Sequence, residues 1–165
     1  MLLLIDTSEI SSIVALGNKQ GKIIDIRKNI TKLKLSQTLL SEINLLLERN
    51  RVSLKGLKGI IVIQGPGSFT GLRVGTSVAN SLGYGLKTPV AGIRKSPEEK
   101  PSAFCGASKV QSMPRTIPKG SVRGPKLKIS YKSILKKGLK KLRYAKPGKM
   151  IRPFYGEKPH ATVKE

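Results

Sequence analysis

Apolar residues follow a regular pattern of strands and helices over residues 1–93, and this pattern constrains the fold more than any other feature. Three strand-like segments come first, and helices then alternate with two further strands. The predicted strands are residues 1–6, 12–16, 22–30, 59–64 and 89–93, and the predicted helices are Leu35–Arg49 and residues 68–86. This βββαβαβ order predicts an α/β domain that opens with an antiparallel meander. Ser36 is the predicted N-cap of the first helix.

The rest of the chain is basic and lacks this pattern. The protein has 165 residues and a formal net charge of +23, of which residues 1–93 carry +7 and residues 94–165 carry +16. Residues 94–128 are rich in Pro, Ser and Lys, and such a composition buries too little apolar surface to offset its ordering entropy. We therefore predict a lobe at residues 1–93, a linker at residues 94–128 and a basic segment at residues 129–165.

Counts of rare residues exclude several classes of protein. The single cysteine, Cys105, excludes an internal disulfide framework and a cysteine-based zinc site. The single histidine, His160, excludes sites that need paired imidazoles, so we expect no metal and no cofactor. No apolar run is long enough to span a membrane, and no leader peptide is expected, which predicts a cytoplasmic protein.

The positive charge favours a polyanionic partner, with nucleic acid ahead of an anionic membrane surface. A soluble surface rich in lysine explains the same charge equally well. The charge alone therefore leaves both interpretations open.

A glycine-rich loop with the sequence QGPGSFTGLRVG, residues 64–75, leads from the fourth strand into the second helix. Ser68 or Thr70 can cap that helix, and its free N–H groups could hold an anion together with Arg73. The loop matches neither a Walker motif nor a dinucleotide-binding loop, and its glycines could instead serve only close packing. The candidate anion-binding residues are Asp6, Thr7, Gly65, Gly67, Ser68, Thr70, Gly71 and Arg73.

Small residues recur every four positions on the second helix, at Gly71, Gly75, Ala79 and Gly83. Glycine inside a helix costs about 1 kcal/mol relative to alanine, so its repetition indicates close approach of another backbone. Either the chain's own sheet or a partner helix could make that approach. A separate apolar set on the same helix favours a partner.

Three motifs together resemble the TsaB family of bacterial tRNA threonylcarbamoyladenosine biosynthesis proteins, which were once classed as glycoproteases. They are DTS at residues 6–8, SQTLL at residues 36–40 and GPGSFTGLRVG at residues 65–75. The resemblance covers residues 1–93, and residues 152–162 are similar to the end of short TsaB-like proteins. It implies a single actin-like lobe of the ASKHA, or ribonuclease H-like, type, with the second lobe missing or vestigial.

The resemblance also implies a role and partners. It implies a non-catalytic subunit that pairs with a catalytic TsaD-like paralogue and acts with a TsaE-like ATPase, so that tRNA is bound through the complex. The catalytic paralogue holds a metal through paired histidines on its first helix, and this chain has none there. Self-association into a homodimer remains an open alternative. The family's two leading helices form the interface, which corresponds here to Leu39, Leu40, Ile43, Gly71, Gly75, Ala79 and Gly83.

A basic amphipathic helix is predicted in the last part of the chain. Its basic positions are Lys132, Lys136, Lys137, Lys140, Lys141 and Arg143. The helix could bind RNA phosphates, lie on an anionic membrane or acidic partner, or replace a lost family helix on the lobe. The first of these alternatives would make the protein a basic RNA-binding protein on a degenerate actin-like lobe.

Overall fold

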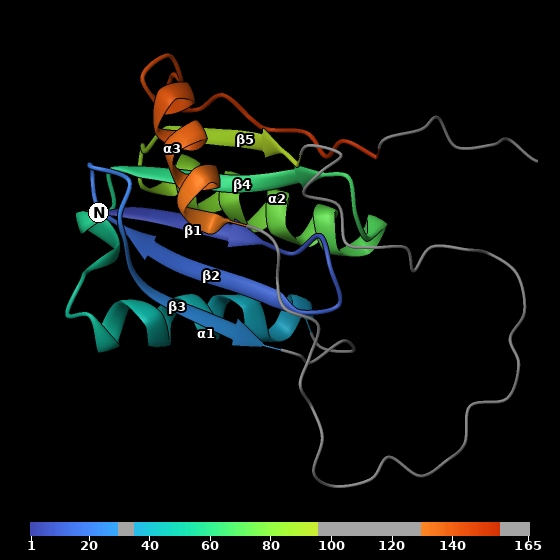
Figure 1. Ribbon diagram of the computed structural model, residues 1–165, viewed down its shortest axis with the longest axis horizontal. Helices are drawn as coiled ribbons and strands as arrows, with labels where there is room; N and C mark the ends of the chain where they lie inside the picture. The colour runs from blue at the N-terminus through green and yellow to red at the C-terminus, as the bar shows by residue number, and fades with distance from the viewer. Residues whose placement is uncertain (30–34, 96–129, 156–165) are drawn as a thin grey trace, which may run out of the picture.

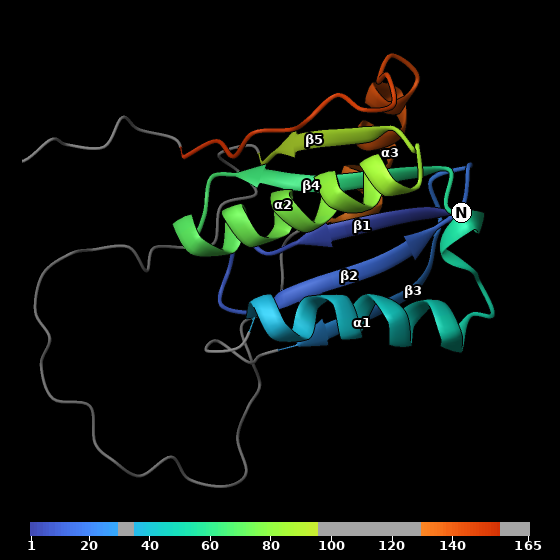
Figure 2. The same ribbon diagram turned by 180° about the vertical axis from the view of Figure 1, so that it is seen from behind.

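The computed structural model describes residues 1–29, 35–95 and 130–155. They form one mixed five-stranded sheet with helices on both of its faces (Figures 1 and 2). In chain order the elements are β1 (Leu2–Asp6), β2 (Ser12–Gly17), β3 (Ile23–Asn29), α1 (Leu35–Arg49), the short 3-10 helix η1 (Leu54–Gly56), β4 (Gly59–Gly65), α2 (Phe69–Gly85), β5 (Val90–Arg94) and α3 (Tyr131–Leu142).

The strand order across the sheet is β3-β2-β1-β4-β5. The pairs β1–β2 and β2–β3 are antiparallel, whereas β1–β4 and β4–β5 are parallel. The predicted α/β fold class and its βββαβαβ order are confirmed. The Ser36 cap prediction is wrong, because α1 begins at Leu35 and Ser36 lies inside its first turn.

Strand position explains strand composition. β1 and β4 lie in the middle of the sheet, are covered on both faces and read as nearly continuous aliphatic runs. β3 lies at an edge, and its residues alternate between half-buried and exposed. The buried central strands therefore form the core to which both helical layers attach.

The helices α1 and α2 cover one face of the sheet, as Figure 2 shows. Alternate residues of β1 divide between the two faces: Leu3 and Ile5 pack toward α1 and α2, while Leu2 and Leu4 pack with α3. Each face therefore has its own aliphatic core.

The helix α3 covers the opposite face, as Figure 1 shows. It buries Tyr131, Ile134 and Leu135 against the sheet. Gly138 interrupts the apolar pattern because any side chain there would collide with Ile61 of β4. Of the three interpretations of this helix, the described contacts fit a packed layer of the lobe, and they leave its basic residues exposed.

Candidate functional site

The turn that follows β1 is held by a buried ion-pair network. The Asp6 carboxylate accepts hydrogen bonds from Ser8 Oγ at 2.6 Å and from Tyr131 Oη at 3.0 Å. Lys95 Nζ lies 3.1 Å from Asp6 Oδ2 and 2.8 Å from Glu9 Oε1, and the Lys95 side chain is 1% exposed. Burial first, and then the Asp6 charge, raises the pKa of Tyr131, so its hydroxyl remains a donor. Asp6 therefore joins β1, β5 and α3 structurally.

The glycine-rich loop packs directly on this turn. Ser68 N donates to Ser8 O at 2.7 Å, and side chains at Gly67 or Gly71 would collide with the backbone of Ser8 or Thr7. Ser68 is the N-cap of α2, because its Oγ accepts from Gly71 N at 3.3 Å, so the structure selects one of the two caps that the sequence offered. The glycines thus allow two turns to meet at backbone distance.

The structure places the predicted anion-binding residues in different surroundings. Thr7 and Gly71 are buried, and Asp6 contributes a negative charge. The Arg73 guanidinium lies 3.9 Å from the ring centre of Phe69, and its Nε donates to Tyr155 Oη at 3.1 Å. The Arg73 guanidinium is thus held against two aromatic rings.

The structure corrects the predicted partner surface. Gly75 packs against Thr7, and Gly83 packs against Val90, so the small-residue ridge faces the chain's own sheet. The buried members of the predicted interface are Leu39, Ile43, Gly71, Gly75, Ala79 and Gly83. Four-residue spacing indicates close packing but does not reveal which neighbour is approached. Of the predicted interface, Leu40 alone is exposed, at 51%.

The outer surface of α1 and α2 has a different set of residues. Leu40 and Leu45 of α1 are both exposed large apolar residues, the second at 46%. The exposed outer positions of α2 include two small residues, Ser77 and Ser81, and Tyr84 near its end. The exposed positions of the two helices thus include both apolar and small residues, which suit packing against another helix.

The segment just before residue 156 runs beside α2. Asn80 and Ile151 exchange two hydrogen bonds of 2.9 Å, and Phe154 N donates to Gln64 O at 2.7 Å. The rings of Phe69 and Tyr155 lie 4.6 Å apart. The sequence predicts a family-like motif in this tail, but no sequence pattern indicates that the tail packs beside α2.

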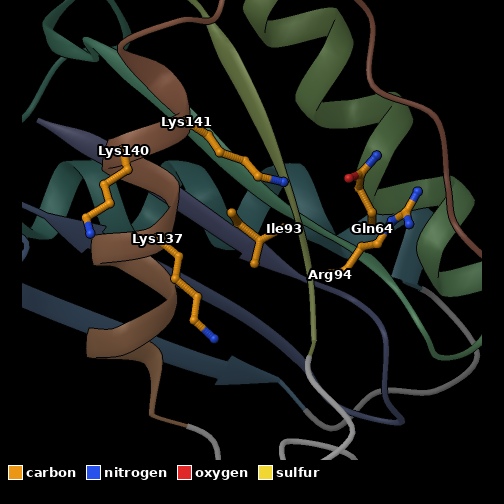
Figure 3. A pocket seen from close by; sticks show the side chains of 6 residues that line it. All are labelled: Gln64, Ile93, Arg94, Lys137, Lys140 and Lys141. Carbon is orange, nitrogen blue, oxygen red and sulfur yellow. The ribbon is translucent and has the colours of Figure 1, made fainter.

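An open groove of about 480 Å³ lies between α3 and the edge strand β5. Its lining residues are Gln64, Ile93, Arg94, Lys137, Lys140 and Lys141. Lys141 reaches toward β5 (Figure 3), where its Nζ donates to Gly92 O at 3.0 Å. Arg94 stacks 3.8 Å from the ring centre of Phe154. The sequence predicted the lysines, but it could not place Arg94 beside them.

Two further findings concern the described part of the chain. It contains no group of three His, Cys, Asp or Glu side chains arranged to hold a metal ion. It also contains no helix with both the length and the apolar character needed to cross a membrane.

Comparison with family models gives a match over residues 26–96 to TsaD, tRNA N6-adenosine threonylcarbamoyltransferase. The tRNA threonylcarbamoyladenosine biosynthesis protein TsaB of Buchnera aphidicola is 34% identical over 93 residues, which cover 56% of this chain and 43% of that protein. A tRNA N6-adenosine threonylcarbamoyltransferase of Nitrosospira multiformis is 55% identical over 42 residues, covering 26% of this chain and 12% of that protein.

A solved structure from Pseudomonas aeruginosa, described as similar to the peptidase YeaZ, matches with a TM-score of 0.53 and 31% identity. The match covers 56% of this chain and 42% of that protein. These similarities confirm the predicted TsaB resemblance, and they show that the N-terminal lobe is homologous to TsaB proteins and has the actin-like fold. The chain spans less than half the length of the curated TsaB relatives that it matches.

Proposed function

We propose that this protein is a non-catalytic accessory subunit in the synthesis of tRNA threonylcarbamoyladenosine. The observation that carries the proposal is the homology of its N-terminal lobe to TsaB proteins, whose name places them in that biosynthesis. In this proposal the chain pairs with a TsaD-like catalytic paralogue and acts with a TsaE-like ATPase. The similarity of one lobe to both TsaB and TsaD proteins supports pairing between related lobes.

The outer surface of α1 and α2 is the proposed contact with the paralogue. Leu40 and Leu45 are about half exposed there, so burying the remaining apolar surface in an interface is favourable by roughly 1 kcal/mol each. The small residues Ser77 and Ser81 let a partner helix approach α2 closely. This surface replaces the glycine ridge as the proposed interface, because the ridge is occupied by the chain's own sheet.

The chemistry of the lobe supports a non-catalytic role. The helix α1 carries no histidine that could serve as a metal ligand. Asp6 and Glu9 are bound to Lys95, and Glu42 is bound to Arg27. These carboxylates contribute to the packing of the lobe, and we assign the transfer step to the partner.

The pairing is tested with the purified full-length chain and the TsaD-like protein of the same organism. Size-exclusion chromatography with light scattering should give a complex at micromolar concentration. Leu40→Arg should abolish it, because a charge would be placed in the apolar contact. The matched control is Ile26→Arg, which changes a residue 45% exposed on β3.

Three results would overturn the pairing proposal. The first is that the wild-type chain forms no complex with the TsaD-like protein, and the second is that the chain associates with itself instead. The third is that Leu40→Arg and Ile26→Arg weaken the complex equally. The wider role has its own test, since deletion of the gene should remove threonylcarbamoyladenosine from total tRNA nucleosides measured by mass spectrometry. An unchanged nucleoside level would overturn the role.

A further inference from the structure

The outer side of α3 carries positive charge that the described part of the chain does not neutralise. Residues 130–155 contain nine Lys or Arg and no Asp or Glu. Four of the five acidic residues elsewhere in the described chain already have partners: Glu42 binds Arg27, Asp25 binds Arg49, and the pair Asp6 and Glu9 binds Lys95. The fifth, Glu48, lies on α1, which packs on the opposite face of the sheet. None of these acidic groups forms an ion pair with α3.

Part of this charge forms a straight stripe. Lys132, Lys136, Lys140 and Arg143 are exposed and make no ion pair with any described residue. Their spacing of four, four and three residues places them along one side of the helix. The stripe is about 16 Å long at 1.5 Å per residue. It can therefore contact several phosphates of one strand, which are about 3.4 Å apart along a duplex axis.

The groove beside β5 adds further cations next to the stripe. We define the basic face as the stripe plus Lys137, Lys141 and Arg94, and Figure 3 shows Lys137, Lys140, Lys141 and Arg94 of it. The backbone that carries this face is fixed, because α3 is held by its buried apolar side and by the Tyr131–Asp6 hydrogen bond. Cations on a folded helix lose less backbone conformational entropy on binding than the same residues on a mobile chain.

The packing of α3 favours RNA over a membrane as the occupant. A helix that lies on a bilayer inserts an apolar face, but α3 already buries Tyr131, Ile134 and Leu135 in the lobe. A nucleic-acid backbone needs only positioned cations. Tyr144, which is 88% exposed next to Arg143, adds an aromatic ring on which an unpaired base can stack.

We propose that the basic face of α3 binds the phosphate backbone of an RNA. The surface rests on α3 and β5 alone, and the proposed role in tRNA modification serves only to choose tRNA as the probe. The proposal adds a direct RNA contact to a chain whose homologous lobe is proposed to act through a protein partner.

Fluorescence anisotropy with the full chain and a labelled, unmodified tRNA transcript tests the proposal. The test variant combines Lys136→Gln, Lys140→Gln and Arg143→Gln. It should weaken binding roughly tenfold or more and lower the slope of log K against log salt by about 2. The matched control, Arg51→Gln, Lys55→Gln and Lys87→Gln, removes the same charge from exposed sites in the segments that follow α1 and α2, and it should change affinity less than twofold.

Circular dichroism confirms that both variants are folded before their affinities are compared. The proposal is overturned by absence of wild-type binding at micromolar concentration, or by equal losses in test and control variants. It is also overturned if phosphatidylserine vesicles or a polyglutamate peptide bind more tightly than the tRNA. None of these outcomes affects complex formation with the TsaD-like protein, so failure here is distinct from failure of the proposed function.

Discussion

The two faces of the sheet are covered by helices that have the same packing chemistry and different outer surfaces. On one face, α1 and α2 together carry two acidic and two basic residues. On the other, α3 carries five lysines and no acidic residue. Both layers bury aliphatic side chains against β1 and β4. The comparison teaches that the core fixes where each helix lies, while the outward residues determine which kind of partner each face can bind.

Lys95→Met should have the largest effect, because it breaks the network that joins the two faces. It leaves the Asp6 carboxylate buried without its cation, and losing one member of a buried pair costs about 3–5 kcal/mol. Urea unfolding measures this loss, and Lys28→Met is an exposed control. A loss of less than about 1 kcal/mol would show that the pair does not stabilise the fold.

Gly75→Leu tests how the α1 and α2 layer is packed. A side chain at Gly75 would collide with Thr7, so we expect a loss of about 3 kcal/mol or failure to fold. Ser81→Leu on the exposed side of α2 should change stability much less. If the Gly75→Leu protein were folded with normal stability but no longer bound the TsaD-like protein, the glycine ridge would be the partner interface after all.

Gly138→Val tests the α3 layer in the same way. The added side chain would press on Ile61, and we expect a loss of about 2 kcal/mol, mostly through weaker docking of α3. Hydrogen exchange followed by mass spectrometry should show faster exchange in α3 than in α1. Unchanged exchange in α3 would mean that the helix does not depend on this close contact.

The smallest expected effect is a pH dependence on the α1 side. The Asn50 side chain, which donates to Asp25, holds the pKa of that carboxyl below its usual 3.8. A lowered pKa gives stability that is present above the usual value and lost as the pH falls through the folded-state pKa. Wild type should therefore exceed Asp25→Asn in stability at pH 6, and the difference should shrink toward pH 3. A constant difference would contradict this.

The sequence predicted the α/β sheet well because strand and helix periods are local signals. The continuous apolar run of β1, for example, indicates a buried strand without any tertiary information. The capping role of Ser68 was also accessible, since it depends on residues three positions apart.

Features that join distant residues could not be predicted. Lys95 meets Asp6 across 89 positions of sequence, and Arg94 joins the lysines of α3 only through the fold. For the glycine ridge, the sequence left the chain's own sheet and a partner helix both open and favoured the partner, because spacing along a helix identifies a face but not what covers it. The same limit applied to α3, whose amphipathic pattern fits a bilayer and a sheet equally well.

The central claim is that the two faces bind different partners independently. The most direct measurement compares affinity for the TsaD-like protein and affinity for tRNA across two variants of the full chain. Leu40→Arg should lose the protein and keep the RNA, whereas the triple variant Lys136→Gln, Lys140→Gln and Arg143→Gln should lose the RNA and keep the protein. Loss of both partners in either folded variant would contradict the claim.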